Sequence, residues 1–173
     1  MLTLRSLLVV GTLVTALVPS AFAITAQEGL NRGSFVINVA EALTSPEVIK
    51  ACPNMLSPDP YTLLFTDVSR GNSFFAETCF LMRAGIVRGY ADGSFHPSDG
   101  ITRAEAAKIL AKAFRPDAVL SSPETPVWYE RYVNVLRSAG YDILKASKAS
   151  DGMTYEEVTA AIRELAPVRA ATE

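Results

Sequence analysis

The spacing of apolar residues predicts one helix that the chain repeats. After Ile101, apolar positions recur every three or four residues, which is the period of a helix with one buried face. This stripe consists of Ala106, Ile109, Leu110, Ala113 and Phe114. Residues 30–43 and 153–165 carry related patterns at matching positions. A repeat at a period near fifty residues indicates stacked units that share a core.

The repeated helices begin with the same kind of signal. Thr102 is a suitable N-cap, and Glu105 three positions later completes a capping box, in which each side chain bonds the backbone N–H of the other residue. Thr154 and Glu157 repeat this box. Asn31 takes the cap position of the first helix, but no glutamate follows it, so we expect a looser helix start there.

A second pattern lies ahead of these helices. Trp128, Tyr132, Leu136 and Gly140 have the spacing of Ser73, Glu77, Leu81 and Gly85. The two glycines predict helix ends in the left-handed conformation. Asp92-Gly93 predicts a tight turn between the two helices of the central unit. Each complete unit is thus two helices and a turn, and the predicted fold class is all-α.

These patterns predict the organisation of the whole chain. The expected parts are a signal peptide (1–23), a partial first unit with a proline-rich connector (24–60), a complete central unit (61–116), a third, degenerate unit (117–167) and a disordered tail (168–173). The connector from 44 to 60 replaces the leading helix of the first unit. Residues 115–126 form a second linker.

The N-terminal residues predict export. The apolar run Leu7–Val18 precedes Ala21-Phe22-Ala23, which favours cleavage after Ala23 over an uncleaved membrane anchor. Removal of Arg5 changes the net charge from −2 to −3. A mildly acidic product has no general attraction for nucleic acid. No later apolar run is long enough to span a membrane, so we expect no membrane span after cleavage.

The residues that could carry chemistry are few. Cys52 and Cys79 either form a disulfide, as an exported chain permits, or Cys79 is a small buried apolar residue on the face of Phe75. Neither has a C-x-x-C partner. His96 is the single histidine and has no nucleophile beside it. The sequence therefore predicts no enzyme activity, no cofactor and no metal site.

Two arginines lie at helix starts, where the local charge opposes them. Arg103 follows the cap Thr102, and Arg32 takes the same place in the first repeat. A cation in the first turn is disfavoured by about 0.3–1 kcal/mol, because the helix N-terminus carries partial positive charge. Together with the free N–H groups, such an arginine makes an anion site. The alternative is that Arg103 pairs with an acidic residue of a neighbouring unit, such as Asp67 or Asp92.

Three further residues have two interpretations each. Trp128 either stacks on a sugar ring or, at helical spacing with Tyr132, packs in the core. Gly89 either lets a glycan approach the backbone or occupies a turn with positive φ. Asp67 either accepts hydrogen bonds from glycan hydroxyls or caps the turn that follows it.

An ordered set of motifs resembles the S-layer homology (SLH) family. The motifs are Phe65-Thr66-Asp67-Val68, Gly85-Ile86, Gly89-Tyr90, Asp92-Gly93-Ser94-Phe95-His96-Pro97 and Ile101-Thr102-Arg103-Ala104-Glu105. The resemblance implies a pseudo-threefold repeat of helix-turn-helix units, here about two and a half, around a central helical bundle. It also implies a non-catalytic protein of the cell surface, cell wall or periplasm that binds cell-wall polysaccharide, often pyruvylated, or a peptidoglycan-linked polymer.

The implied glycan-binding residues are Arg103, Arg32, Thr102, Gly89, Asp67 and Trp128. The chain departs from the family pattern at Ser73, where tryptophan is usual, and at Tyr155, which replaces the motif arginine. The alternative function is therefore an interaction module that has lost glycan binding. Its partners would be envelope proteins or a second copy of the chain in a homo-oligomer.

Overall fold

The computed structural model of the protein describes residues 30–56 and 63–166. The expected signal peptide and C-terminal tail lie outside the described residues. The elements are α1 (Arg32–Leu43), α2 (Pro46–Ala51), the 3-10 helix η1 (Cys52–Met55), β1 (Leu63–Phe65), β2 (Val68–Ser69), α3 (Phe75–Arg83), α4 (Arg103–Phe114), α5 (Pro116–Ser121), α6 (Glu130–Ser138) and α7 (Tyr155–Leu165). The predicted helical class is confirmed.

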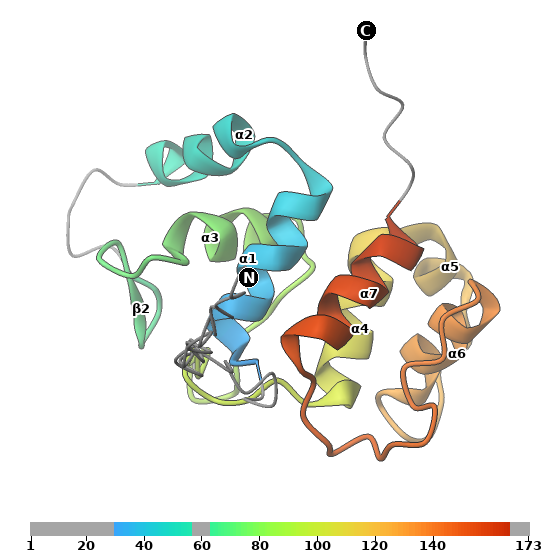
Figure 1. Ribbon diagram of the computed structural model, residues 1–173. Helices are drawn as coiled ribbons and strands as arrows, with labels where there is room; N and C mark the ends of the chain where they lie inside the picture. The colour runs from blue at the N-terminus through green and yellow to red at the C-terminus, as the bar shows by residue number, and fades with distance from the viewer. Residues whose placement is uncertain (1–29, 57–62, 167–173) are drawn as a thin grey trace, which may run out of the picture.

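Helices α1, α4 and α7 contact one another and form the centre of the fold. Helices α2 and α3 lie on the side of α1, and α5 and α6 lie on the side of α4 (Figure 1). None of the helices in the described part of the chain has the length and apolar composition needed to span a bilayer.

The starts of the three central helices are joined by a ring of backbone hydrogen bonds. The N–H of Leu30 donates to Met153 O at 2.8 Å, that of Met153 to Ile101 O at 3.1 Å, and that of Ile101 to Leu30 O at 3.0 Å. Ile101 and Met153 are fully buried. Because buried backbone groups need partners, this ring fixes the positions at which the three helices begin.

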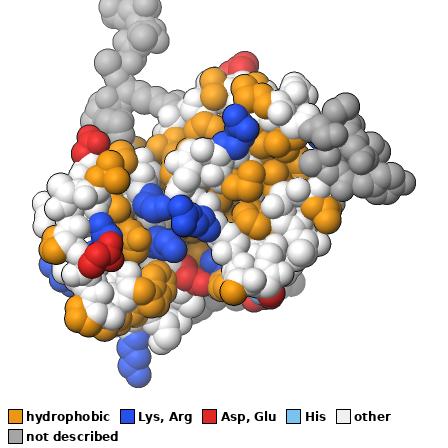
Figure 2. All heavy atoms as spheres, turned by 180° about the vertical axis from the view of Figure 1, so that it is seen from behind, with side chains coloured by type: hydrophobic (Ala, Val, Ile, Leu, Met, Phe, Trp, Pro, Cys, Tyr) orange, Lys and Arg blue, Asp and Glu red, His pale blue; other side chains and the backbone are white. Residues whose placement is uncertain are grey.

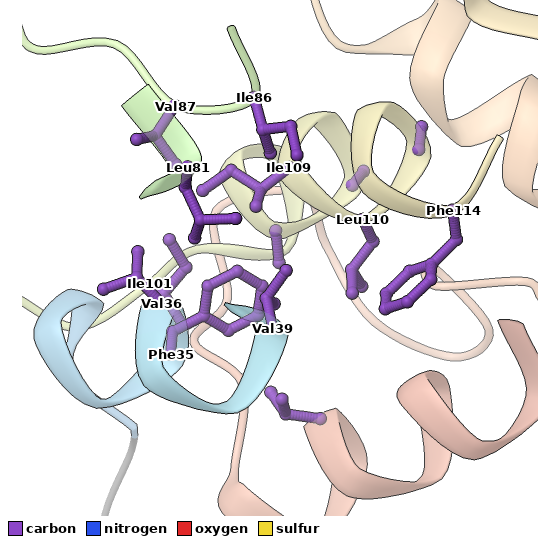
Figure 3. Close-up of a cluster of buried hydrophobic side chains, with 14 of the residues drawn as sticks. Phe35, Val36, Val39, Leu81, Ile86, Val87, Ile101, Ile109, Leu110 and Phe114 are labelled. Atoms are coloured by element: carbon purple, nitrogen blue, oxygen red, sulfur yellow. The ribbon is translucent and has the colours of Figure 1, made fainter. Parts of the chain in front are cut away.

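The buried core runs through α1, α3, α4, α6 and α7. Figure 3 shows part of it: Phe35, Val36 and Val39 of α1, Leu81 of α3, Ile86 and Val87 after it, Ile101, and Ile109, Leu110 and Phe114 of α4. The stripe predicted for α4 is buried as expected except at Ala113, which is half-buried. Burial of such a stripe is the main stabilising contribution to a helical fold of this size.

The predicted helix ends are confirmed. Both capping boxes form, at Thr102 of α4 and Thr154 of α7, and the Asn31 side chain accepts a hydrogen bond at the start of α1. Gly85 and Gly140 adopt φ values of 69° and 93°, so each can end its helix without the strain that a side chain would add. These ends direct the loops that follow toward the N-terminus of the next central helix.

The two segments predicted to be a connector and a linker contain short helices. The connector of the first unit contains α2 and η1, and the second linker contains α5. Pro46 and Pro116 are the first residues of α2 and α5, where the absent N–H of proline costs no hydrogen bond. The chain also forms a small antiparallel pair, β1 with β2, so the fold is helical with one short hairpin.

A disulfide joins the connector to α3. Cys52 of η1 and Cys79 of α3 are bonded, and Cys79 is completely buried. Arg70 adds a second link, since its guanidinium donates to the carbonyl oxygen of Pro53 at 2.9 Å. Of the two alternatives for the cysteines, the structure holds the bonded one, and it fastens a short helical segment to the body of the protein.

Candidate functional site

An ion pair crosses from the start of α1 to the start of α4. Arg32 Nη2 lies 2.7 Å from Glu105 Oε1, and Tyr90 Oη donates to the same oxygen at 2.7 Å. Arg32 also donates to Tyr90 Oη, and its guanidinium carbon is 5.0 Å from the centre of the Tyr90 ring. Arg32 is buried. Its charge is therefore paired with a carboxylate of the protein itself.

The two carboxylate oxygens of Glu105 accept hydrogen bonds from different parts of the fold. While Oε1 faces Arg32 and Tyr90, Oε2 accepts from the backbone N–H and the hydroxyl of Thr102. Burial opposes ionisation of this carboxyl, but the hydrogen bonds from Arg32, Tyr90 and Thr102 lower the pKa of Glu105 from 4.5 to about 2. Burial and the bond to Glu105 raise the pKa of Tyr90 to about 12, so Tyr90 remains a donor.

Glu105 should contribute to stability in a pH-dependent way. A carboxyl with a lowered folded-state pKa contributes stability above its unfolded pKa, near 4.5, and loses it as pH falls toward about 2. Glu105→Gln should therefore lower the free energy of unfolding at pH 7. The gap to the wild type should narrow steadily below about pH 4.5. Urea unfolding at several pH values tests this, and a gap that stays constant down to pH 2 would contradict it.

A second ion pair of the same kind joins α4 to α7. Arg103 Nη2 donates to Glu157 Oε1, and Arg103 Nη1 donates to the carbonyl oxygen of Ile143 at 3.1 Å. Glu157 Oε2 accepts from the N–H of Thr154 at 2.9 Å. Burial opposes ionisation of Glu157, but the contacts from Thr154 and Arg103 lower its pKa below the usual value. The alternative in which Arg103 pairs with an acidic residue from another part of the chain is therefore confirmed, with Glu157 as the partner in place of Asp67 or Asp92.

The third junction, between α7 and α1, lacks this pair at both ends. Tyr155 stands where α4 has Arg103, and its side chain is exposed. Ser34 occupies the position in α1 that Glu105 has in α4. Among the ion pairs of the described residues, none joins α7 to α1. At this junction, both the arginine and the glutamate of the pair are thus replaced by uncharged residues.

A groove of about 240 Å³ opens beside the Arg32–Glu105 pair, at the junction between α1 and α4, which we call the first junction. Its lining comprises Arg32, Ile86, Val87, Arg88, Gly89, Tyr90, Phe95, Glu105, Lys108, Ile109 and Trp128. The floor is apolar and aromatic, and charged side chains surround it. A concave site with an apolar floor and a few polar groups is typical of ligand-binding pockets. Three of the predicted site residues, Arg32, Gly89 and Trp128, meet here, whereas Arg103 does not contribute to the lining.

Trp128 forms one wall of the groove. Its side chain is 52% exposed, so the alternative in which it packs in the core is wrong. The ring lies edge-on to Tyr129, with centroids 5.6 Å apart, and Lys108 Nζ is 5.7 Å from the ring centre. These contacts hold the indole while leaving much of its surface open to a ligand.

The remaining predicted residues have structural contacts. Asp67 accepts hydrogen bonds from the N–H groups of Phe95 and His96, both at 2.8 Å, so it holds the central turn. Of the two interpretations of Gly89, the one in which it occupies a turn with positive φ is wrong. A Cβ at Gly89 would instead lie 2.6 Å from the carbonyl oxygen of Ser94. Close packing therefore explains this glycine, and Thr102 is engaged in the capping box.

Three basic residues at the groove were not identified from the sequence. Arg88 and Lys108 contribute to the lining, and Lys112 follows one turn later on α4. Figure 2 shows basic side chains gathered near the centre of one face, with hydrophobic side chains around them. The available signal was the Lys-x-x-x-Lys spacing of Lys108 and Lys112, which places both on one face of a helix.

The arrangement is suited to binding. Within residues 30–56 and 63–166, no three His, Cys, Asp or Glu side chains are grouped to hold a metal ion. His96 Nε2 lies 2.7 Å from Ser94 Oγ, and the ring faces the carboxylates of Asp92 and Asp99. All of these residues belong to the central turn. The groove offers cations, an exposed indole and an apolar floor, which together match a ligand with anionic groups and ring-shaped apolar faces.

The comparisons agree with the sequence motifs. The model of the S-layer homology domain family matches residues 64–107, which run from β1 into α4 and include the central turn. No curated protein gives a significant match to the chain. S-layer homology domains mediate attachment to the cell envelope and bind cell-wall polymers. Residues 64–107 therefore match the S-layer homology domain, which the sequence motifs of this segment also resemble.

Proposed function

We propose that the protein attaches non-covalently to the bacterial cell envelope by binding an anionic cell-wall glycan, pyruvylated or similar, in the groove at the first junction. The ligand would lie against Trp128, over the loop at Gly89 and Tyr90. Export of the chain is part of this proposal, because the polymer lies outside the cytoplasm. The domain match supports envelope association in general.

The exposed indole in the groove is the observation that carries the proposal. Trp128 is 52% exposed beside an apolar floor, although a tryptophan without a binding role usually buries most of its surface. The flat apolar face of an indole is suited to stacking on a sugar ring. The basic side chains of the rim supply charge complementary to an acidic glycan. Neither arrangement would be needed if the domain were only a structural spacer.

The proposal includes a pseudo-threefold order of the units with unequal junctions. The ring formed by Leu30, Ile101 and Met153 supports this order, as do the two arginine–glutamate pairs at equivalent positions. At the second junction, the Ile143 carbonyl and Glu157 enclose the guanidinium of Arg103. The third junction lacks both charged residues. The first junction is accordingly the proposed binding site.

Retention on purified wall sacculi tests the function. Trp128→Ala should reduce the affinity for sacculi about tenfold or more, as for other central aromatic anchors. The fold should be unchanged, because this side chain is half exposed. Tyr155→Ala is the matched control, since Tyr155 is an aromatic residue of similar exposure, 57%, outside the groove lining.

Two results would overturn the proposal. One is a folded wild-type protein that does not bind sacculi. The other is Trp128→Ala with affinity equal to that of the Tyr155→Ala control. Capture experiments with wall polymer and with envelope extract distinguish the alternative function, because an interaction module would recover protein partners from the extract and leave the polymer unbound.

A further inference from the structure

Three cations at the groove have no acidic partner within residues 30–56 and 63–166. Arg88 is exposed, and Lys108 and Lys112 are half-buried. None of the ion pairs among the described residues includes any of them. Lys108 contacts the Trp128 ring, and Lys112 Nζ donates to the carbonyl oxygen of Gly85 at 2.6 Å. No ion pair among the described residues therefore neutralises this cluster.

The three cations lie close enough to repel one another. Burial lowers the pKa of Lys112, and the charges of Lys108 and Arg88 lower it further. Gathering like charges at one rim destabilises the unbound protein, and Glu105, the carboxylate in the groove lining, is already paired with Arg32. An anionic ligand would relieve this repulsion when it binds.

Unlike these three cations, the two arginines at the helix starts are paired with carboxylates. Arg32 is buried and paired with Glu105, and Arg103 is buried and paired with Glu157. Breaking either pair to receive a ligand would leave a carboxylate without its partner, which is costly at partly buried positions. The net charge available to a ligand is therefore outside the Ile-Thr-Arg-Ala-Glu motif.

We propose that Arg88, Lys108 and Lys112 select the ligand by its charge, and that the ligand is a glycan strand carrying more than one anionic group. This inference rests on the proposed function for the identity of the polymer. A single carboxylate would neutralise one cation and leave two repelling each other. Carboxylate or phosphate groups repeated along a strand would engage Arg88 and Lys108 within the groove and Lys112 beside it.

Affinity measured at several salt concentrations tests the inference. The probes are polysaccharide released from purified sacculi, a hyaluronan tetrasaccharide as a defined dianion, and chitotetraose as a neutral glycan. Arg88→Gln and Lys108→Gln should each weaken binding of both anionic probes about tenfold. Each should also reduce the salt dependence, because a screened charge pair is lost. Chitotetraose should bind the wild type and the variants equally weakly.

A matched control separates the cluster from net charge. The triple variant Lys50→Gln, Lys145→Gln and Lys148→Gln removes three exposed charges outside the groove lining. It should keep wild-type affinity, whereas Arg88→Gln, Lys108→Gln and Lys112→Gln combined should lose binding. If removal of Lys112 disturbs α3 through Gly85, the double variant at Arg88 and Lys108 still decides the question.

The outcomes distinguish this inference from the proposed function. Equal loss of affinity in the cluster variant and the control would overturn charge selection by the cluster. An effect from only one of the single substitutions would overturn the requirement for more than one anion. A wild type that binds the hyaluronan tetrasaccharide through the cluster but ignores wall polysaccharide would support the cluster and refute the proposed function. Failure to bind either anionic probe would refute both.

Discussion

Replacing Cys52 and Cys79 together by alanine is expected to lower the free energy of unfolding by about 3–4 kcal/mol. The bond closes a loop between residues 27 positions apart, and its loss frees this segment in the unfolded chain. Alanine is chosen because Cys79 is fully buried and a serine hydroxyl would lack a partner there. Urea unfolding of the oxidised wild type and the double variant measures the difference.

Reduction supplies the matching control. A thiol reductant should lower the stability of the wild type toward that of the double variant, and it should leave the double variant unchanged. Helicity should remain in both, because the central helices α1, α4 and α7 do not contain either cysteine. Equal stability of the oxidised and reduced wild type would contradict a stabilising role for the bond.

Replacing Arg103 by methionine is expected to cost about 2–4 kcal/mol of stability. Methionine keeps much of the volume but leaves Glu157 and the Ile143 carbonyl without their charged donor, and breaking a buried pair at one end is strongly destabilising. The lower part of that range applies because the Glu157 side chain is 38% exposed. Urea unfolding at pH 7 measures the loss.

Arg163→Met is the matched control for this substitution. Arg163 is an exposed arginine of α7, and it makes none of the ion pairs found among the described residues. Its replacement should change stability by less than about 0.5 kcal/mol. If Arg103→Met were as stable as Arg163→Met but lost affinity for sacculi, then Arg103 would contact the glycan and the enclosed pair would not describe its role.

The local features of the fold could be predicted from the sequence because they depend on neighbouring residues. The cap at Thr102 and the helix end at Gly85 each follow from two or three adjacent positions. The partner of Arg103 lies 54 positions away and depends on how whole units pack. From the sequence, Glu157 is explained by its own capping box and is therefore not a candidate partner for Arg103. A carboxylate has two oxygens, however, and here one completes the cap while the other binds the arginine.

The site was only partly predictable for a similar reason. Helical spacing favours a core position for Trp128 over the alternative of sugar stacking. However, α6 begins at Glu130, so Trp128 lies before the helix and the spacing rule does not apply to it. Arg88 lies in the loop between α3 and α4, whereas Lys108 lies within α4. Only the packing of that loop against α4 brings the two side chains to one rim of the groove.

The ring formed by Leu30, Ile101 and Met153 has a consequence for how large such a protein can be. In a solenoid, each repeat leaves a free face, and the array extends by adding copies. Here every N–H and carbonyl of the ring is already taken by one of the three segments, so a fourth helix start could join it only by breaking a bond. The ring is therefore closed at three members. Each member enters it only through the residue before its N-cap, so the ring does not depend on what lies further upstream in that segment.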